Sequence, residues 1–173
     1  MKPKDNSFPN ATSTRILALM YPTLLALHSL FRWLVLASLL IAVTTAFTGW
    51  IKNKPFTQRD NAIRHWTATI AHIQLLIGIV LYFISPIIDY FLHHYSEAVH
   101  QRQIRFFGME HSVVMVLAII ILTIGSMKAK RVATDQAKFK TMAIWFTLAL
   151  LIILALIPFP FSPMVNRPYF RGF

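Results

Sequence analysis

Apolar residues in this chain are gathered into four long stretches, and charged residues or prolines separate one stretch from the next. The stretches cover residues 23–50, 63–88, 106–127 and 142–158. An α-helix needs about 20 apolar residues, with a range of about 17–25, to cross the hydrocarbon core of a bilayer. The pattern therefore predicts four transmembrane helices.

The segments between the stretches are polar and short, so successive helices are expected to run antiparallel. We predict an all-α integral membrane protein that folds as an up-down-up-down four-helix transmembrane bundle. Residues 1–20 are expected to form a disordered or peripheral leader, residues 21–161 the bundle, and residues 162–173 a C-terminal tail. The apolar pattern begins near Met20, so both Met1 and Met20 are candidates for the native start.

Composition supports a membrane protein. Hydrophobic residues make up 56% of the chain and charged residues 13%, whereas about a quarter of an ordinary soluble domain is charged. There is no cysteine, which excludes disulfides and thiolate-bound metals. The net charge of +11 comes from basic residues at the ends of the apolar stretches, so anionic lipid headgroups rather than nucleic acid are the expected partner.

Basic residues also suggest an orientation, because loops rich in Lys and Arg stay on the cytoplasmic side. The two loops assigned to the inside carry Lys52, Lys54, Arg59, Arg64, Lys128, Lys130, Arg131, Lys138 and Lys140. We therefore predict a multi-pass protein of the bacterial inner membrane with both termini outside.

Five ionisable residues within the apolar stretches stand out: His28, Arg32, His72, Glu110 and His111. A charged group at the centre of a bilayer costs at least about 2.5 kcal/mol, so such residues usually have a partner and a function. The fourth stretch has no ionisable residue.

His28 and His111 are expected at the same depth. With a rise of 1.5 Å per residue, His28 lies roughly 9 Å from Pro22, and His111 lies roughly 7–8 Å from Phe106. Two imidazoles at one level on facing helices are what a haem with two histidine ligands requires. We predict one haem b per chain at most, held by His28 and His111.

Arg32 lies one helical turn from His28, so its guanidinium is a candidate partner for a haem propionate or for Glu110. Glu110 is alternatively expected to orient an imidazole. His72 lies roughly 12 Å from Arg64, near mid-membrane. It is a candidate third ligand, a partner for His111, part of a quinone site, or a hydrogen-bonding residue between helices.

The segments "LHSLFRW", "HIQLLIGIVLYFISP" and "FFGMEHSVVMVLAIIILTIGSMKAKR" resemble small bacterial four-helix membrane proteins loosely labelled cytochrome b or cytochrome b561-like, as does "KFKTMAIWFTLALLIILALIPFPF". The resemblance covers residues 24–161. It implies His28, His72 and His111 as candidate ligands, with Arg32 and Glu110 beside them. Better-known b561-type cytochromes carry ligands for two haems, whereas the fourth stretch of this chain has no histidine.

Together these observations favour an electron carrier without substrate chemistry of its own, with a quinone or a redox protein as its partner. One alternative is a membrane protein that binds copper, zinc or iron through His28, His72, His111 and Glu110. Another is a non-catalytic subunit, in a homo-oligomer or a larger membrane complex, whose polar residues serve helix packing.

Overall fold

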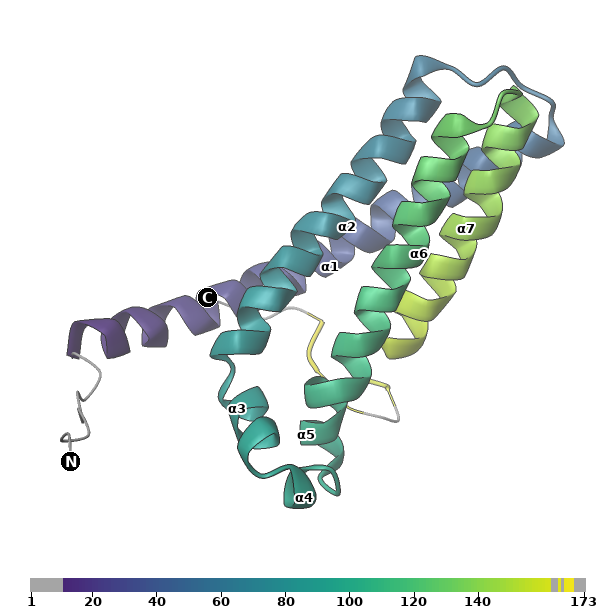
Figure 1. Cartoon of the computed structure of the whole chain (residues 1–173). Coiled ribbons are helices and arrows are strands. Elements are labelled where there is room, and N and C mark those ends of the chain that lie inside the picture. The colour runs from purple at the N-terminus through teal and green to yellow at the C-terminus, as the bar shows by residue number, and fades with distance from the viewer. Residues whose placement is uncertain (1–10, 163–164, 166, 170–173) are drawn as a thin grey trace, which may run out of the picture.

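The computed structural model describes residues 11–162, 165 and 167–169, with side chains from Leu19 onward. This part of the chain is helical, without a β-strand. Four long helices form a bundle (Figure 1): α1 (Ala11–Ile51), α2 (Gln58–Ile84), α6 (His111–Arg131) and α7 (Asp135–Leu156). Helices α1 and α6 each pack against both α2 and α7. The predicted all-helical fold with four long apolar helices is confirmed.

By length and composition, four helical segments are able to cross a membrane: Leu19–Ile51, Gln58–Ile84, Arg102–Arg131 and Asp135–Leu156. Each overlaps one predicted stretch, and the last three begin earlier, in the polar segment that precedes the stretch. Large apolar side chains also cover the outside of the bundle; the most exposed include Leu40, Ile41, Leu76, Phe83, Leu117 and Leu151. Helices that are apolar all round are typical of membrane spans.

The first helix begins earlier than predicted. Helix α1 continues through Pro22 back to Ala11, so residues 11–20 of the expected leader are helical. A proline inside a helix removes one backbone hydrogen bond, yet the helix continues on its N-terminal side. The N-terminal turns of α1 extend away from the other three helices (Figure 1). Residues 1–10 of the predicted leader, and residues 163–164, 166 and 170–173 of the predicted tail, lie outside the described residues.

Capping residues set the starts of α2 and α7. Thr57 and Asp60 form a capping box, in which the Thr57 backbone N–H donates to Asp60 Oδ2 at 2.8 Å. Thr134 Oγ1 accepts from the Ala137 N–H at 3.2 Å at the start of α7. Both caps satisfy backbone N–H groups that have no partner within the helix, which lets the helices begin ahead of the apolar stretches.

Helix α2 ends at Ile84, four residues before the predicted limit. Pro86 explains the difference, because a proline pushes the residue before it out of the helical region, and Ser85 is extended. Three short helices follow, α3 (Pro86–His93), α4 (Tyr95–Ala98) and α5 (Arg102–Arg105). A π-helical turn, η1 (Phe106–Glu110), then leads directly into α6.

Small residues allow the four helices to approach closely. Seven alanines of the core are fully buried: Ala42, Ala46, Ala71, Ala118, Ala129, Ala143 and Ala149. Gly125 of α6 lies directly against the Trp145 side chain of α7, so that a Cβ added at this position would overlap it. Close contact through small residues is a main source of stability between membrane helices.

Candidate functional site

His28 of α1 and His111 of α6 meet inside the bundle. Their ring centroids lie 6.4 Å apart and their ring planes are inclined by 72°. Both side chains are half-buried. The structure brings these two imidazoles together, as their heights on the two helices predicted. Helices α1 and α6 occupy opposite corners of the bundle, because each packs mainly on α2 and α7.

A hydrogen bond fixes which nitrogen of His111 carries a proton. His111 Nδ1 lies 3.1 Å from the carbonyl oxygen of Leu156, the last residue of α7. Because a carbonyl oxygen only accepts, Nδ1 is the donor, and Nε2 of the neutral ring keeps its lone pair. The bond also satisfies one of the carbonyl groups that a helix leaves open at its C-terminal end. Histidines that ligate metals usually show this arrangement.

His28 has an unsatisfied polar atom. Its Nδ1 is buried and has no hydrogen-bond partner among the described residues. Gln74 of α2 fixes the backbone beside it, with Nε2 donating to the His28 carbonyl oxygen at 3.0 Å. Gly78, one turn further along α2, leaves room for the ring, since a Cβ there would lie 3.3 Å from His28 Cε1. A buried nitrogen without a partner costs roughly 1–3 kcal/mol, so its retention calls for an explanation.

The turn η1 shapes the approach to His111. The His111 backbone N–H bonds the carbonyl of Phe106, and Ser112 Oγ donates to the Phe107 carbonyl at 2.7 Å, in each case reaching back five residues. The Phe106 ring lies 5.6 Å from the His111 ring, and the Phe107 ring 6.1 Å from it. π-Helical turns are rare and often lie at functional sites. Hydrophobic periodicity did not predict this one.

The separation of the two imidazoles is one at which both would be able to hold the same metal ion, such as a haem iron. A metal–imidazole bond is about 2 Å long, so two imidazoles on opposite sides of one metal have ring centroids roughly 6 Å apart. The observed 6.4 Å agrees with that separation. The nitrogens that would be available for this are His111 Nε2, which keeps its lone pair, and His28 Nδ1, which has no hydrogen-bond partner among the described residues.

Arg32 and Glu110 do not pair with each other, contrary to one of the alternatives from the sequence. Glu110 instead binds Arg105, with Arg105 Nε donating to Glu110 Oε1 at 2.7 Å. The five-residue spacing across η1 places these two side chains together. Glu110 therefore does not orient His111, whose Nδ1 is bound by the Leu156 carbonyl.

Arg32 reaches the C-terminal segment. Its Nη2 donates to the carbonyl oxygen of Tyr169 at 2.5 Å, and its guanidinium lies 5.3 Å from the centre of the Trp33 ring. Trp33 Nε1 donates to the same carbonyl at 3.0 Å. Arg32 Nε is buried without a hydrogen-bond partner among the described residues. Arg32 Nε, one helical turn from His28 on α1, is thus a donor that remains available to an anionic group.

The Glu110→Gln variant tests the role of this carboxylate. If the two imidazoles hold a haem, we expect its spectrum to match the wild type. The unfolding free energy should fall by about 1 kcal/mol, because the Arg105–Glu110 pair is only partly buried and partly exposed ion pairs contribute little. Reduced-minus-oxidised absorbance and thermal unfolding in detergent measure the two quantities. A shifted spectrum would show that Glu110 acts on an axial imidazole after all.

His72 lies apart from the histidine pair. It is exposed on the outer face of α2, and its Nε2 lies 2.9 Å from Thr123 Oγ1 on α6. The predicted pairing of His72 with His111 is not formed. Among the residues that the structure describes, no group of three or more His, Cys, Asp or Glu side chains is placed to hold a metal ion. The structure therefore does not bring together His28, His72, His111 and Glu110 as a common ligand set.

The tautomer of His72 follows from its partner. Thr123 Oγ1 donates its single proton to the Ile119 carbonyl at 2.6 Å, so it accepts from His72 Nε2–H. His72 Nδ1 then carries the lone pair of the neutral ring. The pair lines a groove of about 330 Å³ whose other lining residues are apolar: Leu75, Ile119, Ile120, Ile124 and Met127.

Sequence reasoning missed three features of these sites. Gly78 and the Leu156 carbonyl contact the two histidines, and neither residue type signals such a role. Arg64 was assigned to the loop after the first apolar stretch, yet it lies within α2 with 6% of its surface exposed. The sequence contained one signal for this buried position. Ser126 is a polar residue in the third apolar stretch, and its Oγ accepts a hydrogen bond from Arg64 Nη1.

Comparison with known proteins adds no family to this description: no protein-family model, no curated protein and no solved structure matches the chain.

Proposed function

We propose that this protein is a b-type cytochrome that transfers electrons and holds one haem b between His28 and His111. The observation that carries the proposal is the meeting of the two imidazoles, 6.4 Å between centroids, from helices at opposite corners of the bundle. A haem held by two imidazoles has no open coordination position, so it exchanges electrons without binding a substrate.

The protein's own groups prepare this site. Leu156 holds the His111 ring through Nδ1 and leaves Nε2 as the ligand atom. Gly78 gives the His28 ring its space. Arg32, one turn along α1 from His28, offers its unpartnered Nε to a propionate carboxylate, for which a guanidinium is a strong donor. Phe106 and Phe107 cover His111 and exclude water.

The same proposal places the bundle in the bacterial inner membrane with up-down-up-down topology and both termini outside. The apolar exterior of the helices supports insertion. The α1–α2 and α6–α7 connections lie at the same end of the bundle (Figure 1). These connections and the adjoining helix ends, residues 52–64 and 128–140, contain nine of the 17 Lys and Arg residues of the chain, which supports a cytoplasmic position for that end. The histidine pair then lies toward the outer face.

A quinol is the electron donor that suits the groove beside His72. The groove is apolar and lies near the middle of α2, where a lipid-soluble molecule has access. His72 Nδ1 presents a lone pair there, which accepts a hydrogen bond from a quinol hydroxyl. His72 thus serves as a binding residue for the donor rather than as a haem ligand.

The absorbance spectrum of the purified protein tests the central proposal. Protein expressed in haem-replete cells and purified in detergent is expected to show a Soret band and, after reduction, a sharp α-band. The expected stoichiometry is one haem per chain. A colourless preparation of folded protein would refute the proposal.

One observation favours a second candidate function, a non-catalytic subunit of a membrane complex. The bonds of His111 to Leu156 and of His72 to Thr123 each join two helices, as purely structural histidines do. A subunit of this kind would be colourless, and alanine at His111 would change its stability alone. The unpartnered His28 Nδ1 favours the cytochrome. A copper, zinc or iron site would have to rest on His28 and His111 alone among the described His and carboxylate residues.

A further inference from the structure

The end of the bundle formed by the α1–α2 and α6–α7 connections is strongly basic. Residues 52–64 and 128–140 contain nine Lys and Arg residues and two acidic residues, Asp60 and Asp135. Both acidic side chains are already engaged, Asp60 in the capping box with Thr57 and Asp135 with Lys138 at 3.1 Å. The positive charge at this end is therefore largely unbalanced.

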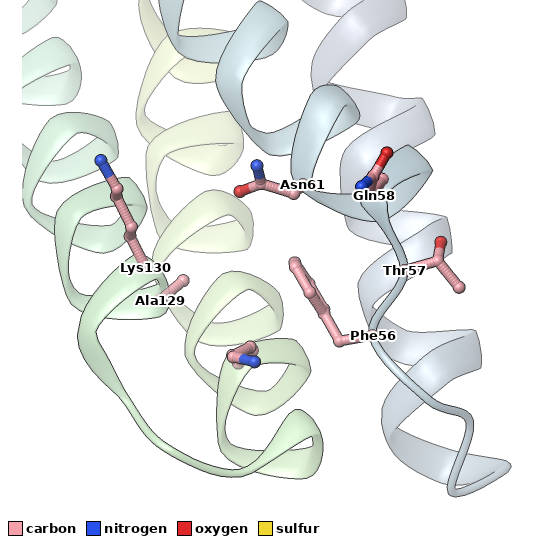
Figure 2. A pocket seen from close by; sticks show the side chains of 7 residues that line it. Phe56, Thr57, Gln58, Asn61, Ala129 and Lys130 are labelled. Carbon is pink, nitrogen blue, oxygen red and sulfur yellow. The ribbon is translucent and has the colours of Figure 1, made fainter.

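A pocket of about 250 Å³ opens at this end, between the start of α2 and the α6–α7 connection. Its polar lining comprises Thr57, Gln58, Asn61, Lys130 and Lys138. Figure 2 shows the Asn61 amide and the Phe56 ring directed into the hollow, whereas the Lys130 side chain on α6 borders it and directs its ammonium group away. The pocket thus combines two lysine side chains with neutral polar groups and an aromatic wall, and one of these lysines, Lys138, is paired with Asp135.

Directly behind Asn61 lies a buried cation without a counter-charge. Arg64 Nε and Nη2 both donate to Asn61 Oδ1, at 3.0 and 2.9 Å, and Nη1 donates to Ser126 Oγ at 2.6 Å. In the described part of the chain, no carboxylate lies within ion-pair distance of Arg64. Buried charges are normally paired, because removing an ion from water is costly. Because Asn61 lies between Arg64 and the pocket, an anion bound in the pocket would provide a negative charge close to the Arg64 guanidinium.

We infer that this pocket binds the phosphate headgroup of an anionic phospholipid. The pocket lies where α2 and α7 begin and α6 ends, which is headgroup depth if these helices cross the membrane as proposed. A phosphate here would bind the flexible Lys130 side chain after it turns inward, and it would share Lys138 with Asp135. Phe56 and Ala129 give the apolar contact that glycerol and acyl carbons need. Basic pockets between helices on the cytoplasmic side are a known type of lipid site. The inference uses the proposed orientation and is independent of haem.

Native mass spectrometry of the detergent-purified full chain tests this site, with phosphatidylglycerol as the probe. We expect one tightly bound phosphatidylglycerol and weak binding of phosphatidylcholine. The Lys130→Gln/Lys138→Gln variant should bind phosphatidylglycerol roughly 30-fold more weakly, since each lysine near a membrane surface contributes about 1 kcal/mol, or about fivefold. The Lys130→Arg/Lys138→Arg variant keeps the charges and should bind nearly as the wild type does.

Lys52→Gln/Lys54→Gln is the matched control, because it removes two exposed charges from the same end of the bundle outside the pocket. It should leave the tight site intact. Equal weakening in both Gln variants would mean general attraction to a basic surface and would overturn the inference. Displacement of the lipid by millimolar inorganic phosphate would likewise overturn it in favour of a free-phosphate site. Far-UV circular dichroism confirms that each variant is folded, and the measurement is informative whether or not haem is present.

Discussion

Replacing His111 with alanine is expected to abolish the haem absorbance of the purified protein. The substitution removes the proposed ligand, whose Nε2 is left free by the bond from Nδ1 to the Leu156 carbonyl. His28 alone would leave a haem with one protein ligand, and we expect at least a tenfold loss in haem bound per chain. Reduced-minus-oxidised spectra of equal amounts of folded protein measure the effect.

Two controls separate a ligand role for His111 from a structural one. His72→Ala removes another imidazole near mid-helix, but one that binds Thr123, so its spectrum should match the wild type. Free imidazole added to His111→Ala should restore part of the α-band, because it can occupy the vacated position. The lost bond to Leu156 costs only about 1 kcal/mol of stability. An unchanged spectrum in His111→Ala would exclude this histidine as a ligand.

Gly125→Leu is expected to lower the thermal stability of the bundle more than any other substitution proposed for this protein. Even a Cβ at this position would overlap the Trp145 side chain, and it would also lie 3.6 Å from Phe146 Cδ1. Helices α6 and α7 would have to separate, and overpacking of a tight interface costs about 1–3 kcal/mol or more. Thermal unfolding in detergent, followed by circular dichroism, measures the loss.

Gly78→Ala serves as the matched glycine control for this measurement. Its added Cβ would lie 3.3 Å from the edge of the His28 ring, a side-chain atom that can shift by a few tenths of an ångström. Its melting temperature should therefore lie much closer to the wild type than that of Gly125→Leu. If Gly125→Leu has the same melting temperature as the wild type, the close contact between α6 and α7 at Gly125 is contradicted.

Hydropathy along the chain was enough to predict the helices, because the number of consecutive apolar residues sets whether a helix can cross a bilayer. It was also enough to predict that His28 and His111 lie at one level, because depth along a helix follows from a constant rise per residue. The helix ends were less accurate. Caps such as Thr57 and breaks such as Pro86 depend on local backbone geometry, which hydropathy does not describe.

The partners of the polar residues were decided only by the tertiary structure. The sequence by itself determined four apolar helices, a basic end and two histidines at equal depth. The fold decided that Glu110 binds Arg105, that Arg32 reaches Tyr169 and that His72 binds Thr123. The physical reason is rotational: residue spacing gives a side chain's height on its helix, whereas the neighbour it meets depends on how each helix is turned and packed.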